Sequence, residues 1–380
     1  MGVVSNPTGV LPSALGTHVV DALAAERRVN LVAAFGPEHG FRGDAQAGSG
    51  AGGAPVRDNR TGVPVYDIYL ASGSKLQGVL RDSGVEVLLF DIQDVGSRFY
   101  TYIWTLYDLL VAVAGMGEAG PRVVVLDRPN PLGGVLVEGP TMAAQLSSFV
   151  GRRPVCLRHG MTVGELARMF NEEWVPGERV AGGRRARLEV SAMEGWRRRM
   201  LWADTRLRWV PPSPNMPTAE TALLYPGMGL VEGTNVSEGR GTCNPFQLSG
   251  APWVDDALLP ALEEGLRAAG AAAMCREAYF TPTFSKFQGQ QCRGVQLYAS
   301  GDPTAFEALP PALAYLTALQ RLYPQKFAFR ADGFFDKLAG TAMWRGMIEG
   351  GASVDELLAA VAAERDEFVA MRAGYLMYAN

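Results

Sequence analysis

The stretch VEVLLFDI, residues 85–92, is the clearest indication of the fold of this 380-residue chain. It is an almost continuous apolar run, and RVVVLD at residues 122–127 is a second one. Such runs are typical of strands that are covered on both faces, as in parallel sheets. Between them, residues 100–114 are apolar almost all round and long enough for a buried helix. This strand–helix–strand order predicts an α/β fold with a doubly wound, mainly parallel sheet.

Further elements precede and follow this centre. Short apolar runs at residues 2–5 and 30–35 predict two more strands, and residues 13–26 have the apolar spacing of a helix. Another helix is predicted after Thr162, which forms a capping box with Glu165. Glu165 therefore has a structural role and is set aside as a catalytic candidate.

The stretch WVPPSPNMP at residues 209–217 holds four prolines, so it is neither helix interior nor central strand. We expect it to join two domains, one at residues 1–215 and one at residues 216–380. The second part carries two helical patterns and one strand pattern, which predicts a smaller α+β domain. These patterns lie near residues 254–269, 353–371 and 295–299.

Composition excludes several classes of protein. The net charge is −4, which disfavours nucleic acid as the main partner. No stretch is long and apolar enough for membrane insertion. The four cysteines form no CxxC pair and are expected to be reduced and mostly buried. The basic run at residues 197–199 is interpreted as a solvated face. No signal peptide is visible, so the chain as written is expected to be cytoplasmic, or periplasmic or secreted if its N-terminus is trimmed.

Polar motifs follow each of four predicted strands. They are SNPTG at residues 5–9, GPEHGFRG at 36–43, DIQDVGSR at 91–98 and DRPNP at 127–131. Ligands of open parallel sheets bind at the carboxyl ends of the strands, so four such motifs predict one shared polar site. The candidates at these ends are Asn6, Glu38, His39, Arg42, Asp91, Gln93, Arg98, Tyr100 and Asn130.

Two polar segments lie outside this pattern, EGTNVSEGRGT at residues 232–242 and FSKFQGQQCRGVQ at residues 284–296. Glycine in the first segment permits a close approach of backbone to ligand. A solvated surface loop is the alternative. Together with isolated polar residues elsewhere, they complete the candidate set: Glu138, His159, Asn215, Glu232, Asn235, Glu238, Arg240 and Lys286.

The motifs in the sequence disfavour a metal site, a nucleotide site and a serine hydrolase. The three histidines are dispersed and form no HExxH, so no metal is expected. The GxGxxG at residues 48–53 follows no apolar strand and reads as a loop; no GxxxxGK[ST] or GxSxG is present. No cofactor is therefore expected. Carboxylates remain, and a pair of them is what hydrolysis of a glycosidic bond requires.

Several long motifs together resemble a known family over nearly the whole chain. GPEHGFRGDAQAG, FDIQDVGSRFYTYIWTL, LDRPNPLGG, RHGMTVGELA, WVPPSPNMPT and YPGMGLVEGTNVSEGRGT resemble the exo-β-N-acetylmuramidase (NamZ-like) family, formerly a domain of unknown function. The resemblance implies a Rossmann-like N-terminal domain and a smaller C-terminal domain that closes the active-site cleft. It also implies release of N-acetylmuramic acid (MurNAc) from non-reducing ends of peptidoglycan fragments such as MurNAc linked to N-acetylglucosamine (MurNAc-GlcNAc), in cell-wall turnover and recycling.

Roles for individual residues follow as hypotheses. Glu38 is expected to be the general acid, with His39 orienting it or the substrate. Glu138, Glu232 and Glu238 compete for the second catalytic role, and Glu238 is ranked first because Asn235 and Arg240 flank it. The 2-acetamido group of the substrate is an alternative nucleophile. An arginine or lysine is expected to bind the lactyl carboxylate of MurNAc. The candidates for this role are Arg42, Arg98, Arg158, Arg240 and Lys286.

Two other functions stay open at this point. One is a non-catalytic protein that binds or senses muropeptides on the same fold, because fold does not determine function. The other is a hydrolase for a different acidic sugar. The expected partner in all three cases is a glycan, and the oligomeric state is not predicted.

Overall fold

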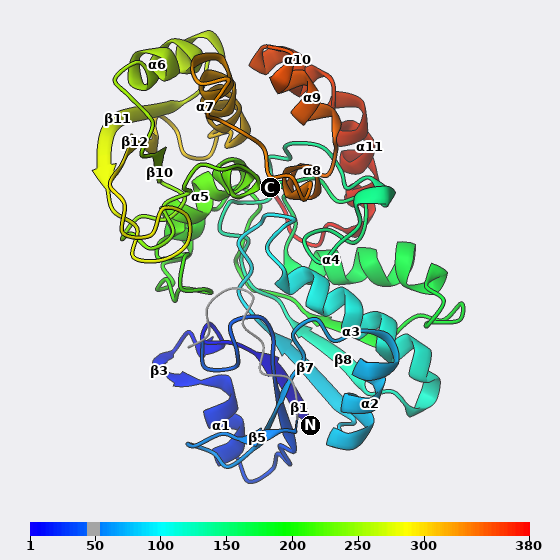
Figure 1. The fold of residues 1–380 in the computed structure, drawn as a ribbon. Coiled ribbons are helices and arrows are strands. Elements are labelled where there is room, and N and C mark those ends of the chain that lie inside the picture. The colour runs from blue at the N-terminus through cyan, green and yellow to red at the C-terminus, as the bar shows by residue number, and fades with distance from the viewer. Residues whose placement is uncertain (44–53) are drawn as a thin grey trace.

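The computed structural model describes residues 1–43 and 54–380 of the chain. A seven-stranded sheet forms the lower half of Figure 1, in the order β5-β6-β4-β1-β7-β8-β9. All neighbouring pairs are parallel except β5 with β6. The strands are β1 (Gly2–Ser5), β4 (Ala33–Gly36), β5 (Val56–Arg57), β6 (Pro64–Asp67), β7 (Val87–Asp91), β8 (Arg122–Leu126) and β9 (Leu188–Ser191).

The strand order reverses between β1 and β7. Chain order runs outward from β1 through β4 to β6 on one side, and through β7 and β8 to β9 on the other. This is the order of a doubly wound dinucleotide-binding-type sheet, whose ligand site lies outside the carboxyl ends of the strands near the reversal. The predicted α/β fold is confirmed. The helices of this part are α1 (Val19–Ala25), α2 (Gly73–Ser83), α3 (Tyr102–Met116) and α4 (Val163–Met169).

Helix α3 is the buried helix predicted at residues 100–114. It packs with α2, and eleven of its residues are buried. At ~1.5–3 kcal/mol for each large apolar side chain that leaves water, this helix is a main source of stability for the domain. The capping box of Thr162 and Glu165 at the start of α4 is also present as predicted.

The sequence prediction was wrong at the start of the first helix, and in the first domain it missed the strands β2, β3, β5, β6 and β9. Residues Ala14–His18 form β3, which pairs with β2 (Val10–Leu11), so α1 begins only at Val19. Strand β9 is an edge strand whose residues alternate between half-buried and exposed, so it carries no continuous apolar run. Strand β6 likewise begins at a proline and is half-buried throughout.

The second part holds a three-stranded antiparallel sheet in the order β10-β12-β11, seen at the upper left of Figure 1. The predicted smaller α+β domain is present. The strands are β10 (Leu248–Ala251), β11 (Ala273–Phe280) and β12 (Cys292–Ala299); the helices are α5 (Ala219–Met228), α6 (Leu258–Ala268), α7 (Leu309–Leu322), α8 (Phe334–Ala339), α9 (Met343–Glu349), α10 (Val354–Ala359) and α11 (Ala362–Arg372).

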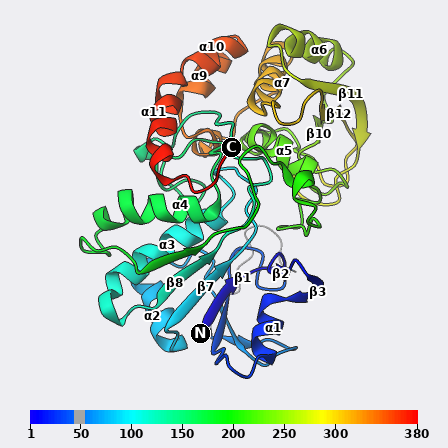
Figure 2. The same ribbon diagram turned by 180° about the vertical axis from the view of Figure 1, so that it is seen from behind.

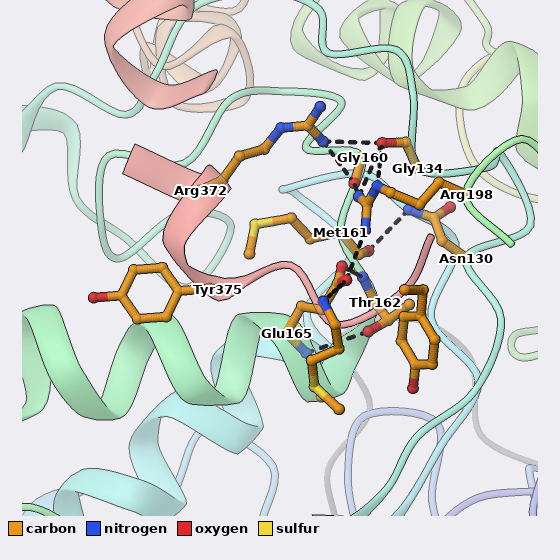
Figure 3. Close-up of polar contacts among 12 residues, drawn as sticks. Asn130, Gly134, Gly160, Met161, Thr162, Glu165, Arg198, Arg372 and Tyr375 are labelled. Carbon is orange, nitrogen blue, oxygen red and sulfur yellow. Dashed lines mark hydrogen bonds and ion pairs between the residues drawn. The ribbon is translucent and has the colours of Figure 1, made fainter. Parts of the chain in front are cut away.

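The C-terminal residues return to the first domain, as Figures 2 and 3 show. Arg372 donates to the carbonyl oxygens of Gly134 and Gly160 at 3.1 and 2.7 Å. Glu165 accepts from the backbone N–H of Met377 at 2.8 Å and from Arg198 at 2.6 Å. The expectation of a solvated face at residues 197–199 is therefore wrong for Arg198, whose side chain is only 3% exposed.

The cysteines, the GxGxxG motif and the helix lengths were further subjects of prediction. All four cysteines are free: Cys156 and Cys292 are buried, Cys275 is half-buried and Cys243 is exposed. The GxGxxG at residues 48–53 lies outside the described residues. Within the described part of the chain, no helix has the length and apolar character of a membrane span.

Candidate active site

A cavity of about 380 Å³ lies where the strand ends of the first domain meet the second domain. This volume is ordinary for a small-molecule site. Residues from both domains line it, so the cavity depends on their packing together. The lining residues are Glu38, His39, Tyr69, Phe99, Tyr100, Thr101, Tyr102, Phe149, Val150, Ser213, Met216, Tyr225, Glu232, Arg240, Phe246, Arg330, Phe334 and Leu338.

Glu38 lies in a tight turn directly after β4. The turn requires positive φ values at His39 (70°) and Gly40 (77°), and a non-glycine residue there is uncommon outside constrained sites. The Glu38 carboxyl accepts a hydrogen bond from Thr101 Oγ1 at 2.5 Å and one from the Tyr69 hydroxyl at 3.2 Å. Two neutral donors from different loops therefore orient a carboxyl that is 8% exposed.

Glu232 faces the cavity from the second domain in a different environment. Its carboxylate pairs with Arg240 at 2.8 Å, and the Arg240 guanidinium stacks over the Phe246 ring at 5.1 Å. Burial raises the pKa of Glu232, and the nearby Glu238 carboxylate adds to this, against the opposing effect of Arg240. Burial alone lowers the pKa of Arg240, but the two carboxylates outweigh it and raise the pKa overall.

Glu238 lies behind this pair. It is 2% exposed and sits between two cations, with Lys286 Nζ at 3.0 Å and Arg240 Nε at 3.4 Å. Lys286 also donates to the carbonyl oxygens of Val231 and Val236 at 3.1 and 2.9 Å. Of these four charged residues, Glu232 and Arg240 line the cavity, and Glu238 and Lys286 do not.

Asn235 holds the same loop from the other side. Its side chain donates to the Lys326 carbonyl at 2.7 Å and accepts from the Ala328 N–H at 3.0 Å. Asn235, Glu238 and Lys286 are thus brought close to the site, but they shape the loop that presents Glu232 and Arg240.

Arg98 and Arg158 are buried in the interior. Arg98 donates to the carbonyl oxygens of Pro140, Val155 and Leu338 at 2.7–2.9 Å, which ties α8 to the first domain. Arg158 pairs with Glu138 at 2.6 Å, and Glu138 also accepts from the Leu309 N–H at 3.1 Å. The structure places Arg98, Arg158 and Glu138 outside the lining of the described cavity, with their polar groups paired inside the protein.

Arg42 is similarly committed, to carboxylates beside the site. It pairs with Asp58 at 2.7 Å and with Asp21 at 2.9 Å. The Arg42 guanidinium holds the pKa of Asp58 well below its ordinary value. These contacts fasten the loop after Gly40 to its surroundings.

The remaining candidates form the polar layer under the cavity. Asn6 donates to the Pro212 carbonyl at 3.4 Å, and Ser213, next to it, lines the cavity. Gln93 donates to the Pro129 carbonyl at 2.7 Å. These residues are buried and support the strand-end loops; they are Asn6, Asp91, Gln93, Asn130, His159 and Asn215.

Three residues of this layer have partners within the protein. Asp91 pairs with Arg128 at 2.6 Å. Asn130 donates to the Met161 carbonyl at 2.9 Å, and His159 Nδ1 accepts from the Met161 N–H at 3.2 Å. Of the sequence candidates, the structure therefore brings Glu38, His39, Tyr100, Glu232 and Arg240 into the cavity lining.

The polar lining residues that the sequence analysis missed include Tyr69, Thr101 and Arg330. Tyr69 follows β6 just as Glu38 follows β4, so recognition of residues 64–67 as a strand would have found it. Thr101 lies next to the N-terminus of the buried helix, where a polar residue faces the strand ends. Arg330 has no sequence signal, because it lies in an irregular segment between α7 and α8.

Comparison with known proteins agrees with this architecture. Two crystal structures of DUF1343 family proteins from Bacteroides fragilis superpose with TM-scores of 0.84 and 0.76, at 30% and 33% identity. They cover 99% and 100% of this chain, which covers 93% and 94% of theirs. Peptidoglycan beta-N-acetylmuramidase NamZ from Bacillus subtilis is 45% identical over 378 residues, 100% of this chain and 86% of that protein.

Family models cover both parts of the chain. The one described as exo-beta-N-acetylmuramidase NamZ, N-terminal, matches residues 1–220, and the corresponding C-terminal one matches residues 223–378. The two matches together span almost every residue, on a fold shared with the solved structures. The chain belongs to the exo-β-N-acetylmuramidase NamZ family.

Proposed function

We propose that this protein is an exo-acting β-N-acetylmuramidase that releases MurNAc from the non-reducing ends of peptidoglycan fragments such as MurNAc-GlcNAc. Its cellular role is then cell-wall turnover and recycling. The observation that carries the proposal is the Glu38 carboxyl, held by Tyr69 and Thr101 in a cavity that Glu232 enters from the other domain. A full-length relative with a peptidoglycan β-N-acetylmuramidase activity in its name supports the substrate class.

Glu38 acts as the general acid in this proposal. Cleavage of a glycosidic bond needs a proton on the departing sugar oxygen as the bond to the anomeric carbon breaks. The hydroxyls of Tyr69 and Thr101 fix the plane of the Glu38 carboxyl, so its proton is delivered along one direction. Positioned acids of this kind contribute ~10²–10⁴-fold to a rate.

Glu232 takes the second role, ahead of Glu238. Glu238 does not line the cavity and already has two cationic partners. The raised pKa of Glu232 makes its carboxylate a better proton acceptor, which suits a group that accepts a proton from the attacking species. That species is water or the 2-acetamido group of the substrate, and the anomer of the first MurNAc released, observed by NMR, distinguishes inversion from retention.

Aromatic rings shape the space between these carboxyls. Phe99, Tyr100 and Tyr225 pack edge to face at centroid distances of 4.9 and 5.8 Å, and all three line the cavity. Such packing fixes the rings, which leaves a preformed apolar surface for a sugar ring. Trp104, an aromatic residue of α3, is buried in the core and does not line the described cavity.

The test compares wild-type protein with Glu38→Gln on MurNAc-GlcNAc, with free MurNAc as the readout. We expect release by the wild type and a decrease of about 10²–10⁴-fold in the variant. Retention of more than a tenth of the turnover would remove Glu38 as the acid. Saturable MurNAc binding with no release by the wild type would favour the binding-protein alternative, and equal cleavage of GlcNAc-GlcNAc would favour a different hydrolase.

A further inference from the structure

Recognition of a sugar acid requires a cation that is able to turn toward the carboxylate of the ligand. Most cations near the cavity are already fixed by the protein. Arg98 and Lys286 each donate to three backbone carbonyl oxygens. Arg158 is 1% exposed and pairs with Glu138. Withdrawal of any of these would leave buried acceptors without donors, which is costly.

Arg42 and Arg240 are each held by two carboxylates. Arg42 pairs with Asp58 and Asp21, and Arg240 with Glu232 and Glu238. A substrate carboxylate placed beside Arg240 would be the third anion around one guanidinium. Repulsion between this carboxylate and the two glutamates opposes its attraction to Arg240. We therefore assign Arg240 to holding Glu232 and not to binding the substrate carboxylate.

Arg330 differs from all five of these cations. It lines the cavity, and its side chain is 44% exposed. Among the described residues, its ion-pair partner is Asp332, which is itself 53% exposed. Arg330 donates to both carboxylate oxygens of Asp332, at 3.2 and 2.5 Å. A ligand carboxylate offers the same bidentate geometry, and solvent screens the existing pair because both side chains are exposed, so one carboxylate is able to replace the other.

The position of Arg330 is nevertheless well defined. Its backbone N–H donates to the Gly233 carbonyl at 2.9 Å, next to Glu232 in the chain. Its guanidinium lies over the Phe334 ring, 4.8 Å from the centroid, and Phe334 also lines the cavity. The backbone is thus anchored next to Glu232, while the guanidinium lies at the cavity edge with the exposed Asp332 as its ion-pair partner.

We propose that Arg330 is a specificity-determining residue, which binds the lactyl carboxylate of MurNAc through its planar guanidinium. The inference rests on the proposed function and deepens it. A neutral sugar gains nothing from Arg330, because the guanidinium stays with Asp332; a sugar acid gains a charge-assisted, bidentate contact. Selection for MurNAc over GlcNAc follows from this difference.

The experiment compares two substrates, MurNAc-GlcNAc and the same disaccharide with its lactyl carboxyl converted to a neutral amide. For wild type we expect kcat/KM to favour the free acid by about 10–100-fold, as is typical of hydrogen bonds to charged groups. In Arg330→Gln the preference falls to within about threefold, mainly through KM. Arg330→Lys retains part of it, because a point charge remains.

Arg345→Gln is the matched control. Arg345 is 37% exposed and pairs with Asp336 at 2.9 Å, but it does not line the described cavity. This variant keeps the wild-type preference for the acid. An Arg330→Gln protein that still prefers the acid as wild type does would overturn the proposal, and so would a wild type that cleaves acid and amide equally well.

A binding measurement separates this inference from the proposed function. Calorimetry of wild type and Arg330→Gln with free MurNAc and its amide needs no turnover. If wild type releases no MurNAc but binds it more tightly than the amide, and Arg330→Gln does not, the hydrolase proposal fails and the role of Arg330 stands. Equal preference in both proteins removes Arg330 whatever the activity.

Discussion

Glu38 and Glu232 line one cavity, but the two domains hold them by different means. Two neutral hydroxyls, of Tyr69 and Thr101, fix Glu38. A guanidinium holds Glu232, with a further carboxylate and a lysine behind it. Hydrogen bonds donated by hydroxyls and an ion pair with a guanidinium both favour the charged form of a carboxylate. Burial and the neighbouring Glu238 raise the pKa of Glu232 against the effect of Arg240. The two carboxyls therefore differ in how they are positioned, Glu38 by hydroxyls and Glu232 within a network of charges, and we assign proton donation to Glu38 and proton acceptance to Glu232.

The largest difference between the two carboxyls is expected when the leaving group of the substrate is changed. In an aryl glycoside of MurNAc the departing phenolate needs little protonation, so the general acid matters less. We expect Glu38→Gln to lower kcat by ~10²–10⁴-fold on MurNAc-GlcNAc. On the aryl glycoside, the kcat of the variant should stay within about tenfold of the wild-type value. Glu232→Gln should lose similar factors on both substrates. Equal losses on both for Glu38→Gln would contradict the division of roles.

A second prediction concerns the charges behind Glu232. Among the described residues, Lys286→Met leaves the buried Glu238 with Arg240 as its ion-pair partner, and loss of one partner from a buried ion pair costs ~3 kcal/mol at the low end. We therefore expect a lower free energy of unfolding, measured by denaturant titration, together with reduced activity. Lys75→Met changes an exposed lysine of α2 and should stay within about 0.5 kcal/mol. Unchanged stability of Lys286→Met would show that the segment around Glu232 and Glu238 does not depend on this ion pair.

The smallest effect is expected from the orienting hydroxyls. Thr101→Val removes the shorter hydrogen bond to Glu38, at 2.5 Å, and should lower kcat by about tenfold with little change in KM, as for the loss of ~1.5 kcal/mol. Tyr69→Phe removes the 3.2 Å bond and should have a smaller effect. Thr105→Val, one helical turn away, is the control. If KM rather than kcat changes, Thr101 contacts the substrate and does not orient the acid.

Local patterns accounted for much of what was predicted. The predicted capping box at Thr162 is present, because it depends on residues three positions apart. The strands at residues 85–92 and 122–127 follow from apolar runs. Placement of Glu38 in the cavity followed from one topological rule, that parallel strands end at the same edge of the sheet.

The central strands, the buried helix between them and the edge of the sheet at which the site lies were thus predictable from the sequence, because apolar runs and strand ends are local features. Only the tertiary structure decided which charges are available there. Arg98 donates to the carbonyl oxygen of Leu338, 240 residues away. Glu165 accepts from Arg198 and from the N–H of Met377, which are 33 and 212 residues away. Arg330 was not a candidate at all, yet it lines the cavity. Whether a cation is buried against carbonyl groups or exposed at a cavity depends on partners distant in the chain, and local pattern carries no information about them.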